Sequence, residues 1–500
     1  MFDEATLADL QGAMASGSLT SHALTESYLT RIETLDPTLH SVLQTNPGAL
    51  ETAGAMDAER RSGRVRSPLH GIPVLVKDNI DTADRMKTTA GSFALGEVTP
   101  SRDAFAVERL REAGAVILGK ANLSEWANFR STRSSSGWSA RGGQCVNPYA
   151  ADRSPCGSSS GSGVAVSANL CAVAVGTETD GSIVCPSSVN GIVGIKPTVG
   201  LVSRSGVVPV SHSQDTPGPM ARTVRDAAAL LSALAGVDER DAATAEARVE
   251  PDYVAFVGPD GLRGSRIGVA RKLAGFNDRV DQLFEEALGA MRDLGAEIVD
   301  PADIPHADDL EDPELEVFLY EFKADLEAYL ATLGPSQPYR RLADLIAFNE
   351  EHADLEMPFF GQELFDGAAE KGPLTEPAYL EALETCRRLS RAEGIDAVMD
   401  EHRLDALVAP SNAPAWRIDY ANGDHHVGGN STPAAVAGYP NVTVPMGFAF
   451  DLPIGISLMG RAWSEGRLIR LASAFEHATD HRRPPSLATG PEPAQNLDDA

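Results

Sequence analysis

Short apolar runs alternate with amphipathic segments along most of this chain. Residues 70–76 and 115–122 are apolar runs of strand length, and residues 102–114 between them carry apolar side chains at helical spacing. Apolar runs of this length are typical of buried strands, whereas a spacing of three and four residues is typical of a helix with one buried face. The order predicts strand–helix–strand units, the building blocks of α/β proteins.

The same alternation continues through the rest of the chain. It predicts helices at 21–35, 161–170, 222–235 and 280–294 and strands at 172–177, 266–270, 296–300, 404–410, 441–447 and 455–462. Residues 134–163 are rich in Ser, Gly and Arg, a composition typical of a linker. They lead directly into a helix and a strand, however, and flexible linkers seldom lie inside such units. The pattern therefore favours one α/β core over separate domains.

The predicted domain spans residues 1–485. Its core is expected at 60–300 and 400–480, and the mostly helical, acidic residues 310–400 are expected to form a lobe beside it. Residues 486–500 carry Pro, Gly and Asp with little apolar content, so we expect a flexible tail.

The charge of the chain excludes two classes of partner. It has 42 Lys and Arg against 71 Asp and Glu, a formal net charge of −29. Nucleic acids and anionic membrane surfaces both repel such a chain. No apolar run approaches the roughly 18 residues of a membrane span. We therefore expect neither nucleic-acid nor membrane partners.

Five cysteines bear on the redox environment, namely Cys145, Cys156, Cys171, Cys185 and Cys386. Their odd number, with four of them in or beside a Ser/Gly-rich segment, argues against a disulfide framework. Cys156 and Cys185 are accordingly expected to be buried small apolar residues. With no secretory leader in the opening MFDEATLADL, we expect a reducing, cytoplasmic environment.

Candidate chemistry lies in two Ser/Gly-rich turns and one lysine. The turns are GSSSG at 157–161 and TETDGS at 177–182, separated by a small-residue helix and an apolar strand. Lys77 ends the apolar run IPVLV at 72–76. A serine needs a base before it can attack a carbonyl, and a desolvated lysine is one of the few alternatives to histidine. The pattern indicates a hydrolase.

Other sites are less well supported. The first turn matches G-x-S-x-G, a nucleophile elbow centred on Ser159, but no downstream Asp and His complete that triad. His477 and His481 have a zinc-binding spacing without the glutamate of H-E-x-x-H, and the pair at 425–426 has no neighbouring cysteine. Glycine patterns for phosphate binding are absent from the sequence. We expect no metal and no cofactor.

Several motifs together resemble the amidase signature enzymes. They are GIPVLVKDNI, GKANLSEWANF, ARGGQCVNPY, GSSSGSG, GTETDGSI, GIVGIKPT, SQDTPGPMARTV and AAVAGYPNVTVPMG, which cover most of the chain. The 24 residues between Ser158 and Ser182 also agree with the spacing of that family's catalytic serines. The resemblance implies the amidase signature fold, a single large α/β domain with a central mixed β-sheet flanked by helices.

The resemblance also implies roles for individual residues. Ser182 matches the acylating nucleophile, Ser158 the bridging serine that follows a cis peptide bond, and Lys77 the neutral base. The oxyanion hole would be formed by the backbone N–H groups of Thr179, Asp180, Gly181 and Ser182. Ser159 would be either a hydrogen-bond partner of Lys77 or a turn residue.

The GTETDGSIVCP form and the SGWSARGG segment are most similar to bacterial peptide amidases, which release ammonia from C-terminal amides of peptides. Asp180 replaces a glycine common in the family, which disfavours acidic acyl groups as substrates. The residues 310–400 and 411–432 are expected to shape the substrate cleft, with Phe359, Phe360 and Trp416 as candidate lining side chains. The chain would then act on small-molecule or peptide amides as a monomer or homodimer.

Two alternatives stay open. One is the glutaminase-type subunit of a tRNA-dependent amidotransferase, which works within a complex. The other is an aliphatic or aryl amidase of broad specificity.

Overall fold

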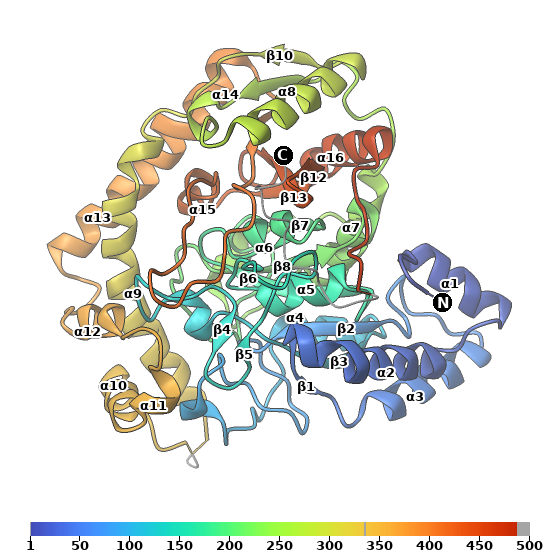
Figure 1. Ribbon diagram of the computed structural model, residues 1–500, viewed down its shortest axis with the longest axis vertical. Helices are drawn as coiled ribbons and strands as arrows, with labels where there is room; N and C mark the ends of the chain where they lie inside the picture. The colour runs from blue at the N-terminus through green and yellow to red at the C-terminus, as the bar shows by residue number, and fades with distance from the viewer. Residues whose placement is uncertain (1, 335–336, 488–500) are drawn as a thin grey trace, which may run out of the picture.

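An eleven-stranded mixed sheet forms the centre of the molecule in the computed structural model, which describes residues 2–334 and 337–487 (Figure 1). Its strand order is β1-β3-β2-β6-β8-β7-β12-β13-β11-β9-β10. Parallel and antiparallel pairs both occur, because β2 runs parallel to β3 and β6 whereas β12 runs antiparallel to β7 and β13. The predicted α/β domain with a central mixed sheet is confirmed.

The strands lie close to the predicted apolar runs. They are β1 (Val42–Thr45), β2 (Pro73–Lys77), β3 (Val116–Ala121), β6 (Val173–Glu178), β7 (Val193–Lys196), β8 (Thr216–Ala221), β9 (Arg266–Val269), β10 (Glu297–Val299), β11 (Ala406–Pro410), β12 (Asn441–Ala449) and β13 (Leu452–Met459). A separate hairpin joins β4 (Trp138–Ser139) and β5 (Gly143–Gln144). β1 pairs with β3, so the sheet begins before the expected core boundary at residue 60.

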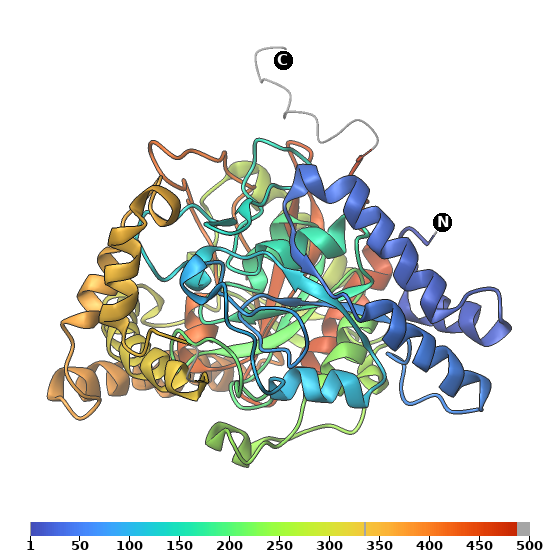
Figure 2. The ribbon, with the colours of Figure 1, turned by 90° about the horizontal axis from the view of Figure 1, so that it is seen from below.

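Helices cover both faces of the sheet. In Figure 2, the small-residue helices α5 and α6 lie above the central strands, and α4 and α7 lie below them. The helices outside the lobe are α1 (Leu7–Ser16), α2 (Ser21–Leu39), α3 (Ala49–Arg61), α4 (Phe105–Glu112), α5 (Ser160–Ser167), α6 (Val184–Val189), α7 (Val224–Leu234), α8 (Asp278–Asp293), α15 (Thr432–Ala437) and α16 (Glu465–Thr479). Every residue of α5 and α6 is buried, because Ser, Gly, Ala and Val let a helix approach the sheet closely.

Residues 310–402 form the predicted helical region at one side of the sheet (Figure 1). Its helices are α9 (Glu311–Thr332), α10 (Leu342–Glu351), α11 (Ala353–Glu356), α12 (Glu363–Ala369), α13 (Pro377–Arg387), a π-helix (Arg388–Ile395) and α14 (Asp396–His402). Aromatic side chains attach it to the core, with the Phe322 ring centroid 5.0 Å from that of Phe129 and Phe365 5.7 Å from Trp126. Such pairs hold the lobe in a fixed position beside the sheet.

The register of the central strands brings distant polar residues to one edge. β2 and β6 are parallel, with Val76 opposite Val175, so their carboxyl ends meet at the same edge of the sheet. Lys77 ends β2, and Thr177 is followed in β6 only by Glu178, where that strand ends. Ligand sites of α/β proteins commonly lie at this edge.

Two predictions concern the surface and the chain end. No helix in the described part of the chain is long and apolar enough to cross a bilayer. Most of the expected tail at 486–500 lies outside the described residues.

Candidate active site

Lys77 lies at the centre of a buried polar cluster. Its side chain is fully buried. The Lys77 Nζ is 2.7 Å from Ser158 Oγ, 2.8 Å from Thr177 Oγ1 and 3.3 Å from the Thr177 carbonyl oxygen. The amine therefore has three polar neighbours within hydrogen-bond distance.

The environment of this amine favours its neutral form. Burial lowers the pKa of Lys77 to about 7, and the negative charges of Asp215 and Glu178 limit the fall. Desolvation acts in this direction because an ammonium ion loses more hydration than an amine. Near neutral pH, a large fraction of Lys77 carries a free lone pair.

Ser158 lies in a tight turn that ends at the first residue of α5. The peptide bond between Gly157 and Ser158 is cis, as the family resemblance implies. Ser158 is 1% exposed, and a Cβ atom at Gly157 would overlap the Ser124 hydroxyl. The close approach of Ser124 therefore requires glycine next to Ser158.

Ser182 lies in the turn between β6 and α6. Gly181 has φ +75°, the left-handed region that favours glycine. The Glu178 carboxylate accepts hydrogen bonds from the backbone N–H groups of Ile183 (2.7 Å) and Val184 (2.9 Å), which fixes the chain just after Ser182. The Ser159 N–H donates to the Ser182 carbonyl oxygen at 3.2 Å, so the two serine turns are in direct contact.

Backbone donors are free in the second turn. Within the described chain, the N–H groups of residues 180–182 donate to no protein acceptor. Backbone N–H groups left unpaired in a folded protein are rare, and a run of them forms a concave site for a negatively charged oxygen.

Thr177 is a site residue that the sequence reasoning did not single out. Besides its contacts with Lys77, its Oγ1 accepts a hydrogen bond from Asn79 Nδ2 at 3.0 Å. The Ser159 hydroxyl donates to the Thr177 carbonyl oxygen at 3.0 Å and accepts from the Thr177 N–H at 3.1 Å. Ser159 thus contacts Thr177 and is one residue removed from Lys77. The strand-end position of Thr177 beside the second turn was the available signal.

Asp215 is a second residue that the sequence reasoning did not assign. Its carboxylate accepts hydrogen bonds from Thr179 Oγ1 (2.6 Å) and from the N–H groups of Val210 (2.8 Å) and Ser211 (3.0 Å). Burial raises the pKa of Asp215 to about 6, against these hydrogen bonds. Asp215 therefore anchors the turn that carries Ser182 and also acts on the charge of Lys77.

A cavity of about 730 Å³ opens over the two serine turns. Its wall includes Gly157 and Gly181, the residues that precede Ser158 and Ser182. Trp416 lines this cavity, as the sequence predicts for the cleft. Phe359 and Phe360 are not among its lining residues, since both rings pack on Trp138, at 5.7 and 5.1 Å between centroids.

Comparison with known proteins identifies the family. The Amidase family model matches residues 23–469. The chain belongs to the amidase signature family. A crystal structure of native peptide amidase from Stenotrophomonas maltophilia superimposes with a TM-score of 0.93 and 53% identity, covering 98% of this chain and 99% of that one.

Two other relatives cover the range of the family. A probable amidase of Arabidopsis thaliana is 45% identical over 97% of this chain and 92% of its own length. One of the subunits of the glutamyl-tRNA(Gln) amidotransferase of a Roseiflexus species is 36% identical over 97% of this chain and 99% of its own length. This amidase is therefore a hydrolase of amides, and the match extends over nearly the whole length of these relatives.

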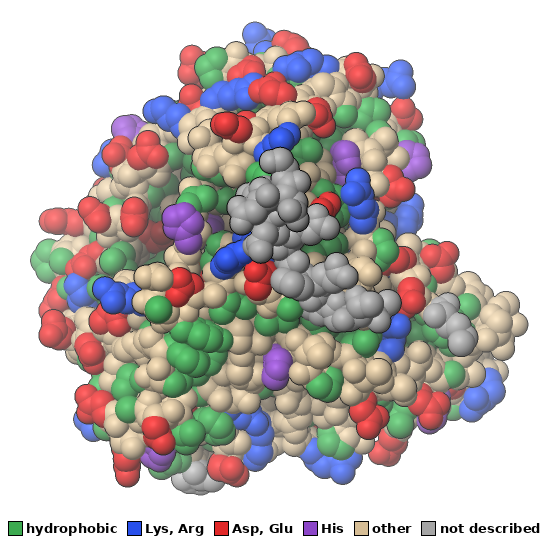
Figure 3. All heavy atoms as spheres, in the orientation of Figure 1, with side chains coloured by type: hydrophobic (Ala, Val, Ile, Leu, Met, Phe, Trp, Pro, Cys, Tyr) green, Lys and Arg blue, Asp and Glu red, His purple; other side chains and the backbone are tan. Residues whose placement is uncertain are grey.

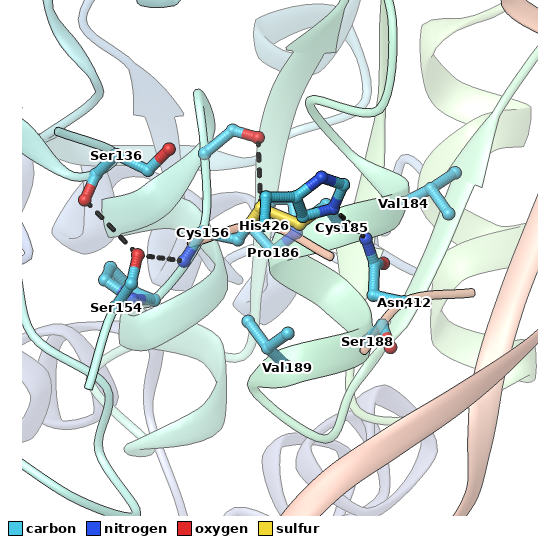
Figure 4. The surroundings of a disulfide bond; sticks show 12 residues. Ser136, Ser154, Cys156, Val184, Cys185, Pro186, Ser188, Val189, Asn412 and His426 are labelled. Atoms are coloured by element: carbon cyan, nitrogen blue, oxygen red, sulfur yellow. Dashed lines mark hydrogen bonds between the residues drawn. A yellow bond between two sulfur atoms is a disulfide. The ribbon is translucent and has the colours of Figure 1, made fainter. Parts of the chain in front are cut away.

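A disulfide bond between Cys156 and Cys185 corrects one prediction (Figure 4). The expectation that both are free apolar residues is wrong. Cysteines 29 positions apart come together because Cys156 precedes Ser158 by two residues and Cys185 follows Ser182 by three. The bond ties the two serine turns to each other. The cytoplasmic prediction rested on reduced cysteines, and this bond removes that support.

Removing this bond should lower the stability of the amidase. In the chain-entropy picture, a bond that closes a loop of this length contributes about 3–4 kcal/mol. We expect Cys156→Ala/Cys185→Ala to lower the free energy of unfolding by about that amount, measured by urea denaturation without reductant. Cys386→Ala removes a buried free thiol and serves as the control. Equal losses in the two variants would contradict a stabilising bond.

One group in the described chain has the composition of a metal site, namely His212, Glu321 and Asp325. His212 Nδ1 lies 2.9 Å from Asp325 and Nε2 lies 3.3 Å from Glu321. Burial disfavours a charged ring, but the hydrogen bond and charge of Asp325 and the charge of Glu321 raise the pKa of His212. Two carboxylates around one imidazole suit a protonated ring, which ties α9 to the loop that carries Asp215.

Proposed function

We propose that this amidase releases ammonia from C-terminal amides of peptides through Ser182 as nucleophile, Ser158 as bridging serine and Lys77 as base. The observation that carries the proposal is the Lys77–Ser158 contact of 2.7 Å inside a fully buried cluster. A buried amine with a pKa of about 7 has the property that a general base needs at neutral pH.

The three contacts of Lys77 suit a neutral amine. A neutral amine has two N–H groups and one lone pair. The Thr177 hydroxyl and carbonyl oxygens can accept both N–H groups, which leaves the lone pair for the Ser158 hydroxyl proton. Thr177 would therefore orient the base toward Ser158.

In the proposed reaction, Ser158 passes the proton of Ser182 to Lys77 as the Ser182 oxygen attacks the amide carbon. The negative charge on the substrate oxygen is stabilised by backbone N–H groups of the second turn, which Thr179 also belongs to. Each such donor typically contributes about 2.7–4 kcal/mol to transition-state stabilisation. The proton returns through Ser158 to the leaving nitrogen, ammonia departs, and water hydrolyses the acyl-enzyme.

The size of the cavity supports a peptide substrate. About 730 Å³ is within the range of pockets that bury a drug-sized ligand and far exceeds the volume of acetamide. The wall of this cavity includes Trp416, whose indole can contact a part of the substrate remote from the scissile bond. Binding energy from remote contacts can raise kcat/KM.

The amidotransferase subunit is the second candidate, because such subunits match over nearly the full chain. Their identity of 36% is lower than the 53% of the peptide amidase. A glutaminase-type subunit would need glutamine recognition and a partner chain. Whether this amidase is a monomer or a homodimer, and which compartment holds it, stay predictions.

Ammonia release distinguishes these activities. We expect a C-terminally amidated dipeptide to give a kcat/KM at least about 100-fold above acetamide and free glutamine, since only the dipeptide can use the cavity wall. Trp416→Ala should lower kcat/KM for the dipeptide amide more than for acetamide. Tyr420→Ala, on an exposed side chain outside the cavity wall, is the matched control. Preference for glutamine would favour the amidotransferase alternative.

A further inference from the structure

The wall of the active-site cavity carries charge of one sign. Five carboxylates line it: Asp180, Asp308, Glu311, Glu314 and Asp424. Among the described residues of this wall, none is Lys or Arg. Its one imidazole, His426, has a pKa lowered by burial, which the charges of Asp180 and Asp424 only partly offset. The cavity therefore has a negative potential near neutral pH.

Two of these carboxylates repel each other inside the cavity. Burial raises the pKa of Asp180, against hydrogen bonds from the Ser431 and Thr432 hydroxyls. Burial and the charge of Asp180 raise the pKa of Glu314. Glu314 is 7% exposed and Asp180 belongs to the turn that carries Ser182, so this pair lies beside the proposed nucleophile.

The hydrogen bonds of this pair are incomplete. Thr432 Oγ1 donates to Asp180 Oδ2 at 2.7 Å, but the buried Asp180 Oδ1 has no hydrogen-bond partner among the described residues. Gln214 Nε2 donates to Glu314 Oε1 at 2.8 Å. A buried acceptor without a donor is costly, and so is a pair of like charges. A donor that carries positive charge would relieve both.

The first turn of α9 extends the negative wall outward. Glu311 and Glu314 are three residues apart and therefore share one face of the helix. Both line the cavity, whereas the intervening Asp312 does not. Asp308 and Glu311 are exposed, so they lie where a substrate enters. The edge of the molecule formed by α9, α12 and α13 also carries many acidic side chains (Figure 3).

We propose that this cavity selects amides with a cationic acyl part, an ammonium or guanidinium group bound between the Asp180–Glu314 pair and the outer carboxylates Asp308 and Glu311. The proposal rests on the peptide-amide function above and names its substrate class. The cation is either the α-ammonium group of a short peptide amide or a lysine or arginine side chain. Anionic and neutral acyl groups leave the carboxylates unpaired and bind less well.

Two matched substrate pairs test the proposal by kcat/KM for ammonia release. The first compares a neutral dipeptide amide with a free α-amino group and its N-acetyl form. The second compares N-acetylated dipeptide amides with lysine or norleucine before the C-terminal residue. We expect at least one pair to show a preference of about tenfold for the cation, and the pair that shows it identifies the source of the charge. The preference should fall as ionic strength rises.

The variant Asp308→Asn/Glu311→Gln tests the wall itself. Partly exposed ion pairs typically change an affinity by about two- to fivefold each, so the double variant should lose most of the tenfold preference. Asp312→Asn lies in the same helical turn outside the cavity wall and should keep it. Both variants change the charge of an exposed first turn, so effects on α9 stability are matched.

The outcomes separate this proposal from the function on which it rests. Absence of ammonia release from every peptide amide would overturn the proposed function. Release without a charge preference in either substrate pair would overturn only the cation proposal. A preference that is equal in wild type, the double variant and Asp312→Asn would also overturn it.

Discussion

Ser182→Ala should abolish hydrolysis of every amide substrate while the fold stays intact. Removing a serine nucleophile typically lowers kcat by about 10⁴–10⁶-fold, because the remaining groups only bind the substrate and stabilise its oxyanion. The hydroxyl is replaced in a turn whose backbone is held by Glu178 and Gly181, so the free energy of unfolding should change little. Ammonia release and labelling by a serine-directed phosphonate measure the loss.

The chain offers a matched control in Ser187. It is buried in α6 five residues after Ser182, and its hydroxyl has no hydrogen-bond partner among the described residues. Ser187→Ala should therefore keep near-normal turnover and labelling. If Ser182→Ala stays active and labelled while Ser159→Ala loses both, the nucleophile elbow centred on Ser159 is the correct interpretation.

Activity should depend on the neutral form of Lys77. The proposed base accepts a proton only when it is an amine, so kcat/KM should rise with pH through a limb near 7 and then level off. Lys77→Met keeps an apolar side chain of similar length and removes the amine. We expect it to lower kcat by about 10²–10⁴-fold and to remove the limb. Near-normal turnover in this variant would exclude the relay.

Asp215 provides an independent check on the origin of that limb. Its negative charge raises the pKa of Lys77, so Asp215→Asn should move the limb to lower pH. At a pH below 7, the variant should then retain a larger fraction of its own maximal rate than wild type does. Loss of the Thr179–Asp215 hydrogen bond should lower the maximal rate as well. A limb that does not move would assign it to a group other than Lys77.

The structure also shows why this base is unusual among the lysines of the chain. Burial lowers the pKa of Lys120 and Lys196 too, and all three are fully buried. Lys120 contacts the Ile80 carbonyl oxygen and Thr88 Oγ1, and Lys196 lies 3.4 Å from the Ala434 carbonyl oxygen. Of these three, Lys77 alone contacts a serine hydroxyl. Burial supplies the lowered pKa, but the neighbour decides what a neutral amine can do.

Sequence periodicity predicted most of the fold correctly because the central strands are buried on both faces. The apolar runs at 70–76, 115–122 and 172–177 became β2, β3 and β6 within one to three residues at each end. The strand at 216–221 was not predicted, because TPGPMA contains two prolines and a glycine, residues that rarely mark a central strand. Its pairing with β6 and β7 outweighs that local preference.

The amino-acid sequence by itself determined the family, the α/β class and the three residues proposed for catalysis, because these depend on local motifs. Only the tertiary structure decided how they meet. Lys77 lies 81 residues from Ser158 and 100 from Thr177 along the chain, and the parallel pairing of β2 with β6 sets their contact. The Cys156–Cys185 bond and the packing of Phe359 and Phe360 on Trp138 likewise depend on which segments fold together. Residue types and spacing carry no information on such distances, whereas burial and contact between distant segments are properties of the folded chain.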